Sequence, residues 1–176
     1  KAIRVHDHQA RIIESQCIYC EKCILVCPQD AKEEQNMIPA ICNAMENKTQ
    51  VIASLHPAYL ARFGVTGING IREAMKKLGF ADAADAAEGA SLMISQYRAL
   101  FAEQKEPGIM ISSACPVIVQ LVKKHYPHLL GNLVQSASMM QFHASYLKKE
   151  YPKAEIVYVS PCISAMSELR DSGNEV

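Results

Sequence analysis

Apolar and polar positions follow two different periods along the chain, and these periods predict strands and helices in turn. The runs 51–55 and 155–159 are short and rich in apolar residues, and each ends at a turn with proline, which is typical of buried strands. A third run of this kind, 109–111, follows Pro107-Gly108. Helical spacing predicts helices over 58–63, 69–78, 88–104, 116–126, 138–150 and 163–170.

The order of these elements predicts an α/β fold. Strands that alternate with helices pair in parallel through right-handed crossovers, which produces an open parallel sheet flanked by helices. A short, turn-rich segment with cysteines precedes the sheet, and a connector with a helix that begins near Pro39 joins the two. We therefore expect a small module over 1–36, a connector over 37–48 and an α/β lobe over 49–176.

Composition excludes several classes of protein. Of the 176 residues, 49% are hydrophobic, which suffices for a packed core, and 18 basic residues balance 18 acidic ones. Nucleic-acid binding needs a clustered basic excess, so we expect no nucleic-acid partner. No apolar run reaches the roughly 18 residues of a membrane span and the polar opening is no signal peptide, so we expect a cytoplasmic protein. Because the chain begins at Lys1 rather than Met, we interpret it as part of a longer protein.

Four of the seven cysteines lie in one segment, Cys17-Ile-Tyr-Cys20-Glu-Lys-Cys23-Ile-Leu-Val-Cys27-Pro28. This is the C-x2-C-x2-C-x3-C-P run of bacterial ferredoxins, in which closely spaced thiolates bind a [4Fe–4S] cluster. Zinc sites use two separated C-x2-C pairs instead, and an odd cysteine count argues against a disulfide framework. The run therefore predicts [4Fe–4S] ligands at all four cysteines and a partial ferredoxin-like module, with zinc or no metal as the alternative.

The fourth cysteine of the run leads to a further hypothesis. In two-cluster ferredoxins this cysteine ligates the other cluster. The opening residues Lys1–Val5 resemble the tail that follows a C-P pair in a ferredoxin half, so a first run would stand just upstream. The first three cysteines of the present run would then share a cluster with a cysteine outside this chain, and Cys27 would serve the second cluster. Cys42 is an alternative ligand, although its place in a helical stretch favours a structural role.

Two later cysteines occupy equivalent places in the predicted lobe. Cys115 follows the predicted strand 109–111 and Cys162 follows the strand 155–159, and a helix begins soon after each. Ligands of open α/β sheets bind at the carboxyl ends of the strands, so these two thiolates would form half of a metal-cluster site. The alternative is a pair of ordinary buried cysteines.

Segments around these cysteines resemble the [FeFe]-hydrogenase large-subunit catalytic domain, and the resemblance extends over residues 49–171. Ser112-Ser-Ala-Cys-Pro116 is similar to that family's T-S-C-C-P segment, and Ser160-Pro-Cys-Ile-Ser-Ala-Met-Ser-Glu168 to its M-P-C-x-x-K-x-x-E segment. Ser138-Met-Met-Gln141 is similar to its S-P-x-Q segment, with Met139 in place of proline. A ferredoxin module directly before this domain is also the arrangement of that family.

The resemblance implies roles for individual residues. Cys115 and Cys162 would each hold a corner of a hydrogenase-type active-site cluster in the full-length protein, and Gln141 would contribute to binding it. The family's proton-relay cysteine falls at Ala114, and the lysine that hydrogen-bonds the diiron ligands falls at Ala165. Neither alanine has a side-chain donor, so we expect no hydrogenase turnover from this chain.

The resemblance is closest to the sensory-type, hydrogenase-like proteins, in which ferredoxin clusters precede a degenerate hydrogenase domain and signalling domains follow. We therefore expect an iron–sulfur protein that transfers electrons or senses redox state or hydrogen. Its partner would be a redox protein or a downstream signalling domain. The alternatives are a divergent [FeFe]-hydrogenase and an iron–sulfur scaffold or assembly protein.

Overall fold

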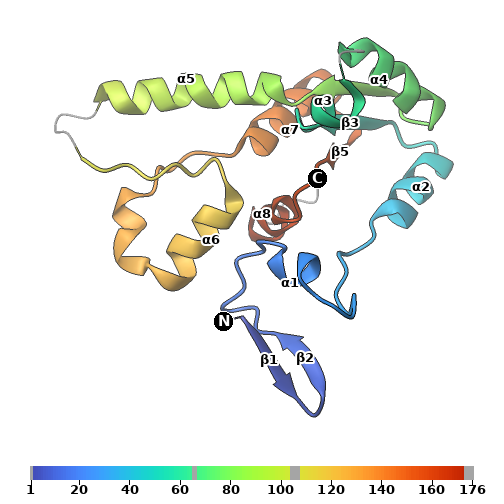
Figure 1. Cartoon of the computed structure of the whole chain (residues 1–176). Helices are drawn as coiled ribbons and strands as arrows, with labels where there is room; N and C mark the ends of the chain where they lie inside the picture. Colours follow the sequence, from blue (N-terminus) through green and yellow to red (C-terminus); the bar gives the residue numbers. More distant parts are fainter. Residues whose placement is uncertain (1, 65–66, 104–107, 173–176) are drawn as a thin grey trace.

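A computed structural model of the chain describes residues 2–64, 67–103 and 108–172. Its centre is a parallel sheet of three strands in the order β4-β3-β5, formed by Asp82–Asp85, Val51–Leu55 and Glu155–Val159 (Figure 1). The central strand β3 pairs in parallel with both neighbours. This arrangement confirms the predicted α/β fold with an open parallel sheet flanked by helices.

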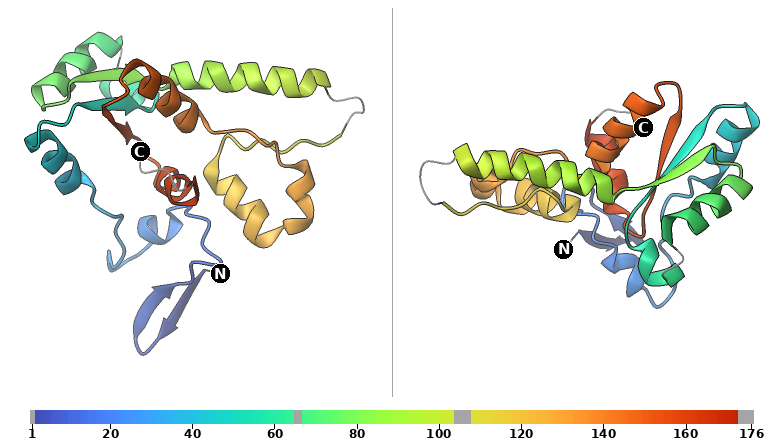
Figure 2. Two further views of the ribbon diagram at one scale, coloured as in Figure 1. Left: turned by 180° about the vertical axis from the view of Figure 1, so that it is seen from behind. Right: turned by 90° about the horizontal axis from the view of Figure 1, so that it is seen from above.

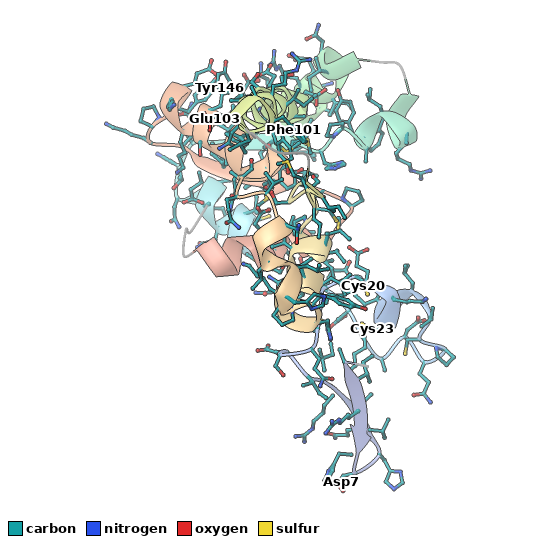
Figure 3. All side chains as sticks on the ribbon, turned by 90° about the vertical axis from the view of Figure 1, so that its left-hand side faces the viewer. Asp7, Cys20, Cys23, Phe101, Glu103 and Tyr146 are labelled. Atoms are coloured by element: carbon teal, nitrogen blue, oxygen red, sulfur yellow. The ribbon has the colours of Figure 1, made fainter. Side chains whose placement is uncertain are left out.

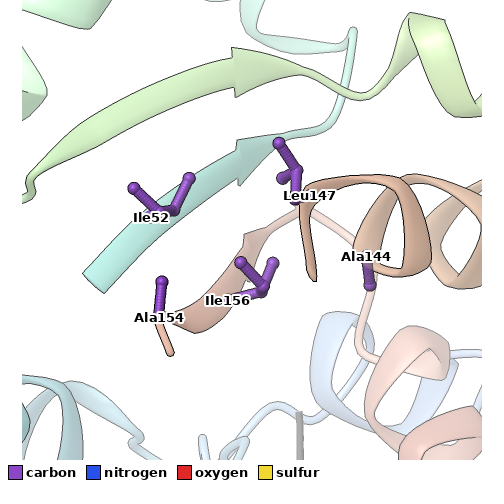
Figure 4. Close-up of a cluster of buried hydrophobic side chains, with 5 residues drawn as sticks. All are labelled: Ile52, Ala144, Leu147, Ala154 and Ile156. Carbon is purple, nitrogen blue, oxygen red and sulfur yellow. The ribbon is translucent and has the colours of Figure 1, made fainter. Parts of the chain in front are cut away.

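Helices cover both faces of the sheet. Ile52 faces one side, where it packs with Ile156 and with Leu147 of α7 (Met139–Glu150) (Figure 4). The neighbouring positions Ala53 and Leu55 face the other side, where side chains of α3 (Tyr59–Phe63) and α4 (Gly67–Lys77) pack against them. Burial on both faces explains why β3 is a continuous run without alternating exposed positions.

The other helices connect or flank these layers. They are α1 (Lys22–Leu25), α2 (Ile38–Glu46), α5 (Ala87–Glu103), α6 (Pro116–His125), the 3-10 helix η2 (Pro127–Asn132) and α8 (Ser164–Ser172). The start of α5 packs against α7, and the rest of α5 extends beyond the sheet (Figure 2). α6 contacts both η2 and α8. In the described parts of the chain, no helix combines the length and the apolar character that a membrane crossing requires.

The prediction of a sheet strand over 109–111 was wrong. Within 108–111 only Ile111 forms a bridge, to Leu133, and Ile109 is 80% exposed. The segment lies beside the α6–η2 unit, where it finds a single short partner and little burial to favour a longer strand. The third strand is instead β4, whose sequence Asp-Ala-Ala-Asp has residues that are depleted in strands, and pairing with buried β3 overrides this preference.

An antiparallel hairpin at the start of the chain was not predicted. It consists of β1 (Ile3–His6) and β2 (Gln9–Ile12), joined by Asp7 and His8 with positive φ angles of 50° and 60°. A two-residue turn with both φ values positive matches the right-handed twist of the flanking strands. The alternation of apolar and polar residues on both sides of Asp7-His8 was the available signal. The hairpin extends away from the sheet (Figure 1).

Candidate iron–sulfur sites

The first candidate site is the loop that bears the ferredoxin-like cysteine run. Tyr19 and Glu21 have positive φ angles of 56° and 62°, so the chain turns sharply on both sides of Cys20. The loop then enters the single turn of α1, which bears Cys23. Such left-handed positions are uncommon for residues other than glycine, and here they allow three thiols within seven residues to surround one space.

That space is a cavity of about 760 Å³. Its walls include Cys17, Cys20 and Cys23 together with apolar side chains from the hairpin and the loop. Figure 3 shows Cys20 and Cys23 beside the lower end of α6, between the hairpin and the lobe. Cys27 lies outside this lining, and its Sγ accepts a hydrogen bond from the backbone N–H of Ala31 at 3.4 Å.

The three cysteines line one cavity without meeting at a point. Among the described residues, no three His, Cys, Asp or Glu side chains lie close enough together to hold a single metal ion. A [4Fe–4S] cluster is an extended body whose thiolates bind different iron atoms, so its ligands line a space. The backbone N–H of Tyr19, 3.5 Å from the Sγ of Cys17, supplies the type of donor that tunes cluster sulfur atoms.

The C-terminal end of α6 holds the cysteine loop against the lobe. The Nζ of Lys124 donates to the carbonyl oxygens of Cys17 at 2.7 Å and Glu14 at 2.9 Å, and it lies 5.2 Å from the centre of the Tyr19 ring. The Nε2 of His125 lies 2.9 Å from the carbonyl oxygen of Gln16. From its sequence position alone, Lys124 is only a cation at a helix C-terminus, so its role at this loop had no signal in the sequence.

The second candidate site involves Cys115 and Cys162. Cys115 is the N-cap residue of α6, and Cys162 stands two residues before α8, with its Sγ 2.9 Å from the Oγ of Ser164. Cys162 follows strand β5 as predicted, but Cys115 follows no strand of the sheet. The two cysteines therefore share no sheet edge; they are related because the helices that begin beside them contact each other.

A cavity of about 550 Å³ lies beside these helices. Its walls include Ser113 and Pro116, which flank the Cys115 turn, as well as Gln141 and Glu168. The backbone N–H of Gln141 donates to the Oγ of Ser138, the N-cap of α7, so the helix start places Gln141 at the cavity. Three of the segments that predicted this site thus reach one cavity from α6, α7 and α8, whereas Cys115 and Cys162 are exposed and lie outside its lining.

Tyr97 of α5 fixes the turn before Cys115. Its hydroxyl oxygen accepts the backbone N–H of Ser113 at 2.9 Å and lies 3.1 Å from the Oγ of both Ser112 and Ser113. The Oγ of Ser112 in turn accepts the backbone N–H of Ala114. Leu92 and Phe101 of the same helix are exposed, because α5 extends past the sheet, whereas Tyr97 is a polar anchor for this turn.

Two side chains near the carboxyl end of the sheet, half-buried Tyr158 and buried His143, have altered pKa values. Burial raises the pKa of Tyr158 to about 12, and the negative charges of Glu168 and Cys162 contribute in the same direction. Burial lowers the pKa of His143, whose Nδ1 lies 2.6 Å from the Oγ of Ser54. Both groups therefore stay uncharged near neutral pH. No sequence pattern distinguished them from ordinary core residues.

Family profiles match both parts of the chain. The family described as the iron only hydrogenase large subunit, C-terminal domain, matches residues 49–175, which is more than half of the chain. The chain belongs to this family. The 4Fe–4S binding domain family matches residues 10–33, which include the cysteine run. The chain is thus a [4Fe–4S]-binding member of the iron-only hydrogenase family, which confirms the predicted resemblance.

Two curated relatives of this hydrogenase-family chain align with most of its length. The cytosolic Fe-S cluster assembly factor NAR1 of Candida dubliniensis is 26% identical over 190 aligned residues, which cover 94% of this chain and 32% of that protein. The NADP-reducing hydrogenase subunit HndD of Solidesulfovibrio fructosivorans is 24% identical over 186 residues, with coverage of 91% and 32%. The chain therefore spans about a third of the length of these relatives.

The fold also matches that of a solved protein of the same family. The fold superposes on that of an [FeFe]-hydrogenase with a TM-score of 0.61 at 22% identity. The structure of that hydrogenase was solved in a study of its inactivation by oxygen, which begins at the 2Fe subcluster of its H cluster. The match covers 76% of this chain and 40% of that protein. At this identity the match establishes the shared fold.

Proposed function

We propose that this protein transfers electrons or senses redox state or hydrogen, and that it does not turn hydrogen over rapidly. The cavity shared by Cys17, Cys20 and Cys23 carries this proposal, because three thiols that line one space at the boundary of the lobe suit a [4Fe–4S] cluster. A bound cluster of this type supplies a site that gains and loses single electrons. We assign Cys115 and Cys162, with Gln141 nearby, to a second, hydrogenase-type cluster in the full-length protein.

Proton supply is the reason for proposing slow or absent hydrogen turnover. Hydrogen chemistry needs a titratable group within hydrogen-bond reach of the reacting atoms. Ala114 and Ala165 stand where the family has its relay cysteine and its lysine, and a methyl group neither donates nor carries a proton. The backbone N–H of Ala114 is already bonded to the Oγ of Ser112. Glu168 lines the 550 Å³ cavity, but a single carboxylate does not replace both missing groups.

The ligand assignment is tested by iron analysis of anaerobically prepared full-length protein. We expect the Cys20→Ser/Cys23→Ser double variant to lose roughly four iron atoms, because both residues would serve one cluster. Cys23→Ser/Cys27→Ser should lose roughly eight, because these residues would serve two. Cys42→Ser is the matched control and should retain the iron of the wild type. Equal losses from the two double variants would refute the division between clusters, and an iron-free wild type would refute the proposed function.

The catalytic part of the proposal is tested by restoring the missing groups. The full-length wild type, reduced with dithionite, should evolve hydrogen at a rate close to that of a cluster-free control. Ala114→Cys/Ala165→Lys should raise this rate if proton supply is the limit. Hydrogen evolution by the wild type at ordinary enzyme rates would show that the protein is a divergent hydrogenase.

An assembly role is the second candidate, favoured by the likeness to NAR1, which is about as close as that to the hydrogenase subunit. An assembly protein passes its cluster on, whereas an electron carrier retains it through many cycles. Repeated reduction and oxidation beside an apo-ferredoxin acceptor separates the two. We expect the iron to stay with this protein, in a cytoplasmic setting with a redox protein or a signalling domain as partner. Iron recovered in the acceptor would favour assembly.

A further inference from the structure

Glu21 links the two cysteine sites directly. It stands between Cys20 and Cys23, and its Oε1 accepts a hydrogen bond from the backbone N–H of Ile163. Ile163 is the residue after Cys162 and also lines the 760 Å³ cavity of the first site. A carboxylate on the loop of one site therefore holds the backbone of the other, just before α8 begins.

Lys124 forms a second link, of opposite charge. Its ammonium group donates to the carbonyl oxygen of Cys17 on the cysteine loop. Lys124 is near the end of α6, the helix whose N-cap residue is Cys115. Two charged side chains thus contribute to holding the cysteine loop: a cation joined through α6 to Cys115 and an anion bonded next to Cys162. α6 and α8 contact each other, so the two links belong to one packed unit (Figure 1).

We propose that Glu21 and Lys124 are positioning residues that couple the redox state of the first site to the turn that bears Cys162. This proposal rests on the proposed function, since it requires a cluster on the cysteine loop. A fixed negative charge disfavours the arrival of an electron nearby and a fixed positive charge favours it. Glu21 therefore lowers the reduction potential of the first site, and Lys124 raises it.

The coupling arises because the charge of the first site also acts on Glu21 and Lys124. Reduction transfers one electron from a low-potential donor, which is oxidised, to the first site; no covalent bond or proton is involved. The added negative charge repels the Glu21 carboxylate and attracts the Lys124 ammonium. The bond from Ile163 to Glu21 weakens while the bond from Lys124 to Cys17 strengthens. The turn at Cys162 is thereby looser in the reduced protein than in the oxidised one.

The experiment uses full-length protein prepared anaerobically, with dithionite as the donor. Reduction potentials are measured by EPR-monitored titration, and exchange of the Ile163 amide by hydrogen–deuterium exchange. Glu21→Gln removes the charge and keeps an acceptor oxygen, whereas Glu21→Ala removes both. Lys124→Met removes the cation. Glu103→Gln and Lys149→Met are the matched controls, since Glu103 lies at the far end of α5 (Figure 3) and Lys149 is exposed near the end of α7.

We expect Glu21→Gln to shift the potential of the first site to a less negative value and Lys124→Met to shift it to a more negative one, with no shift in the controls. Glu21→Ala should accelerate exchange of the Ile163 amide about tenfold, whereas Glu21→Gln should leave exchange in the oxidised state near the wild-type rate. In the wild type, reduction should accelerate this exchange, and in Glu21→Gln it should not.

Several results would overturn the coupling. If Glu21→Gln and Lys124→Met have the same reduction potentials as the controls, the proposed effect of the two charges on the first site is refuted. If the Ile163 amide exchanges at the same rate in reduced and oxidised wild type, the proposed loosening of the Cys162 turn is refuted. Either result in iron-containing protein refutes the coupling and leaves the proposed function intact. Iron-free wild-type protein would refute both, and the Glu21→Ala exchange rate would still report whether the link to Ile163 exists.

Discussion

Gly89 is the point of closest approach between α5 and α7, and substituting it tests how these helices hold the second site. A Cβ atom built on Gly89 overlaps the backbone carbonyl oxygen of Met139 and lies 2.7 Å from the Cβ and 2.9 Å from the backbone nitrogen of His143. Two of these three neighbours are backbone atoms, which no rotamer change moves away. Gly89→Ala therefore forces α5 and α7 apart at the start of α7, close to Gln141.

The expected magnitude combines two opposing effects. Alanine is favoured over glycine inside a helix by about 1 kcal/mol, which would stabilise the variant. Overpacking of a tight contact costs about 1–3 kcal/mol, and backbone neighbours place this site at or above the upper end of that range. We therefore expect Gly89→Ala to lower the free energy of unfolding by about 2 kcal/mol net. With a urea m-value of about 2 kcal/mol/M, the unfolding midpoint should fall by about 1 M.

Urea unfolding monitored by circular dichroism measures this change. Gly131→Ala is the matched control, because no atom lies within 4 Å of a Cβ built there. The control should unfold within about 0.5 kcal/mol of the wild type. If Gly89→Ala is as stable as the wild type or more stable, helix propensity outweighs the steric conflict, and the close packing of α5 on α7 is not what holds these helices.

Two further predictions concern Tyr97 and pH. Tyr97→Phe leaves the backbone N–H of Ser113 without its acceptor, so we expect the free energy of unfolding in urea to fall by about 1–2 kcal/mol and full-length protein to retain less iron at Cys115. Tyr146→Phe, at an exposed position, is the control and should change neither quantity. A Tyr97→Phe variant with wild-type stability and iron content would refute the anchor role. Burial holds the pKa values of His56 and His143 below 6.5 in the folded state, so the unfolded state takes up protons first as the pH falls. The free energy of unfolding in urea should therefore be highest above about pH 6.5 and decrease below it, and the decrease should be smaller in His143→Gln. A wild-type free energy of unfolding that stays constant between about pH 7.5 and 5.5 would contradict the lowered pKa values of these histidines.

The family and the type of cofactor were predictable from the sequence. The run from Cys17 to Cys27 carries its ligand spacing within one short segment, so local geometry alone identifies the cofactor. The strand 51–55 was predictable because burial on both faces makes it a continuous apolar run. The strand 155–159 is at the sheet edge and is only partly buried, and its β-branched and aromatic residues made it predictable. β4 was not predictable, since its small and acidic residues become a strand only through pairing with β3.

The sequence by itself therefore determined the family and predicts which residues bind iron and which proton donors are missing, because these predictions depend only on residue type and spacing. Only the tertiary structure decided how the sites relate to each other. The contact of Glu21 with Ile163 and that of Lys124 with Cys17 join segments that are more than 100 residues apart in the chain. Such pairs leave no periodic or local pattern, because they depend on the packing of α6 against α8 and on the turn of the cysteine loop.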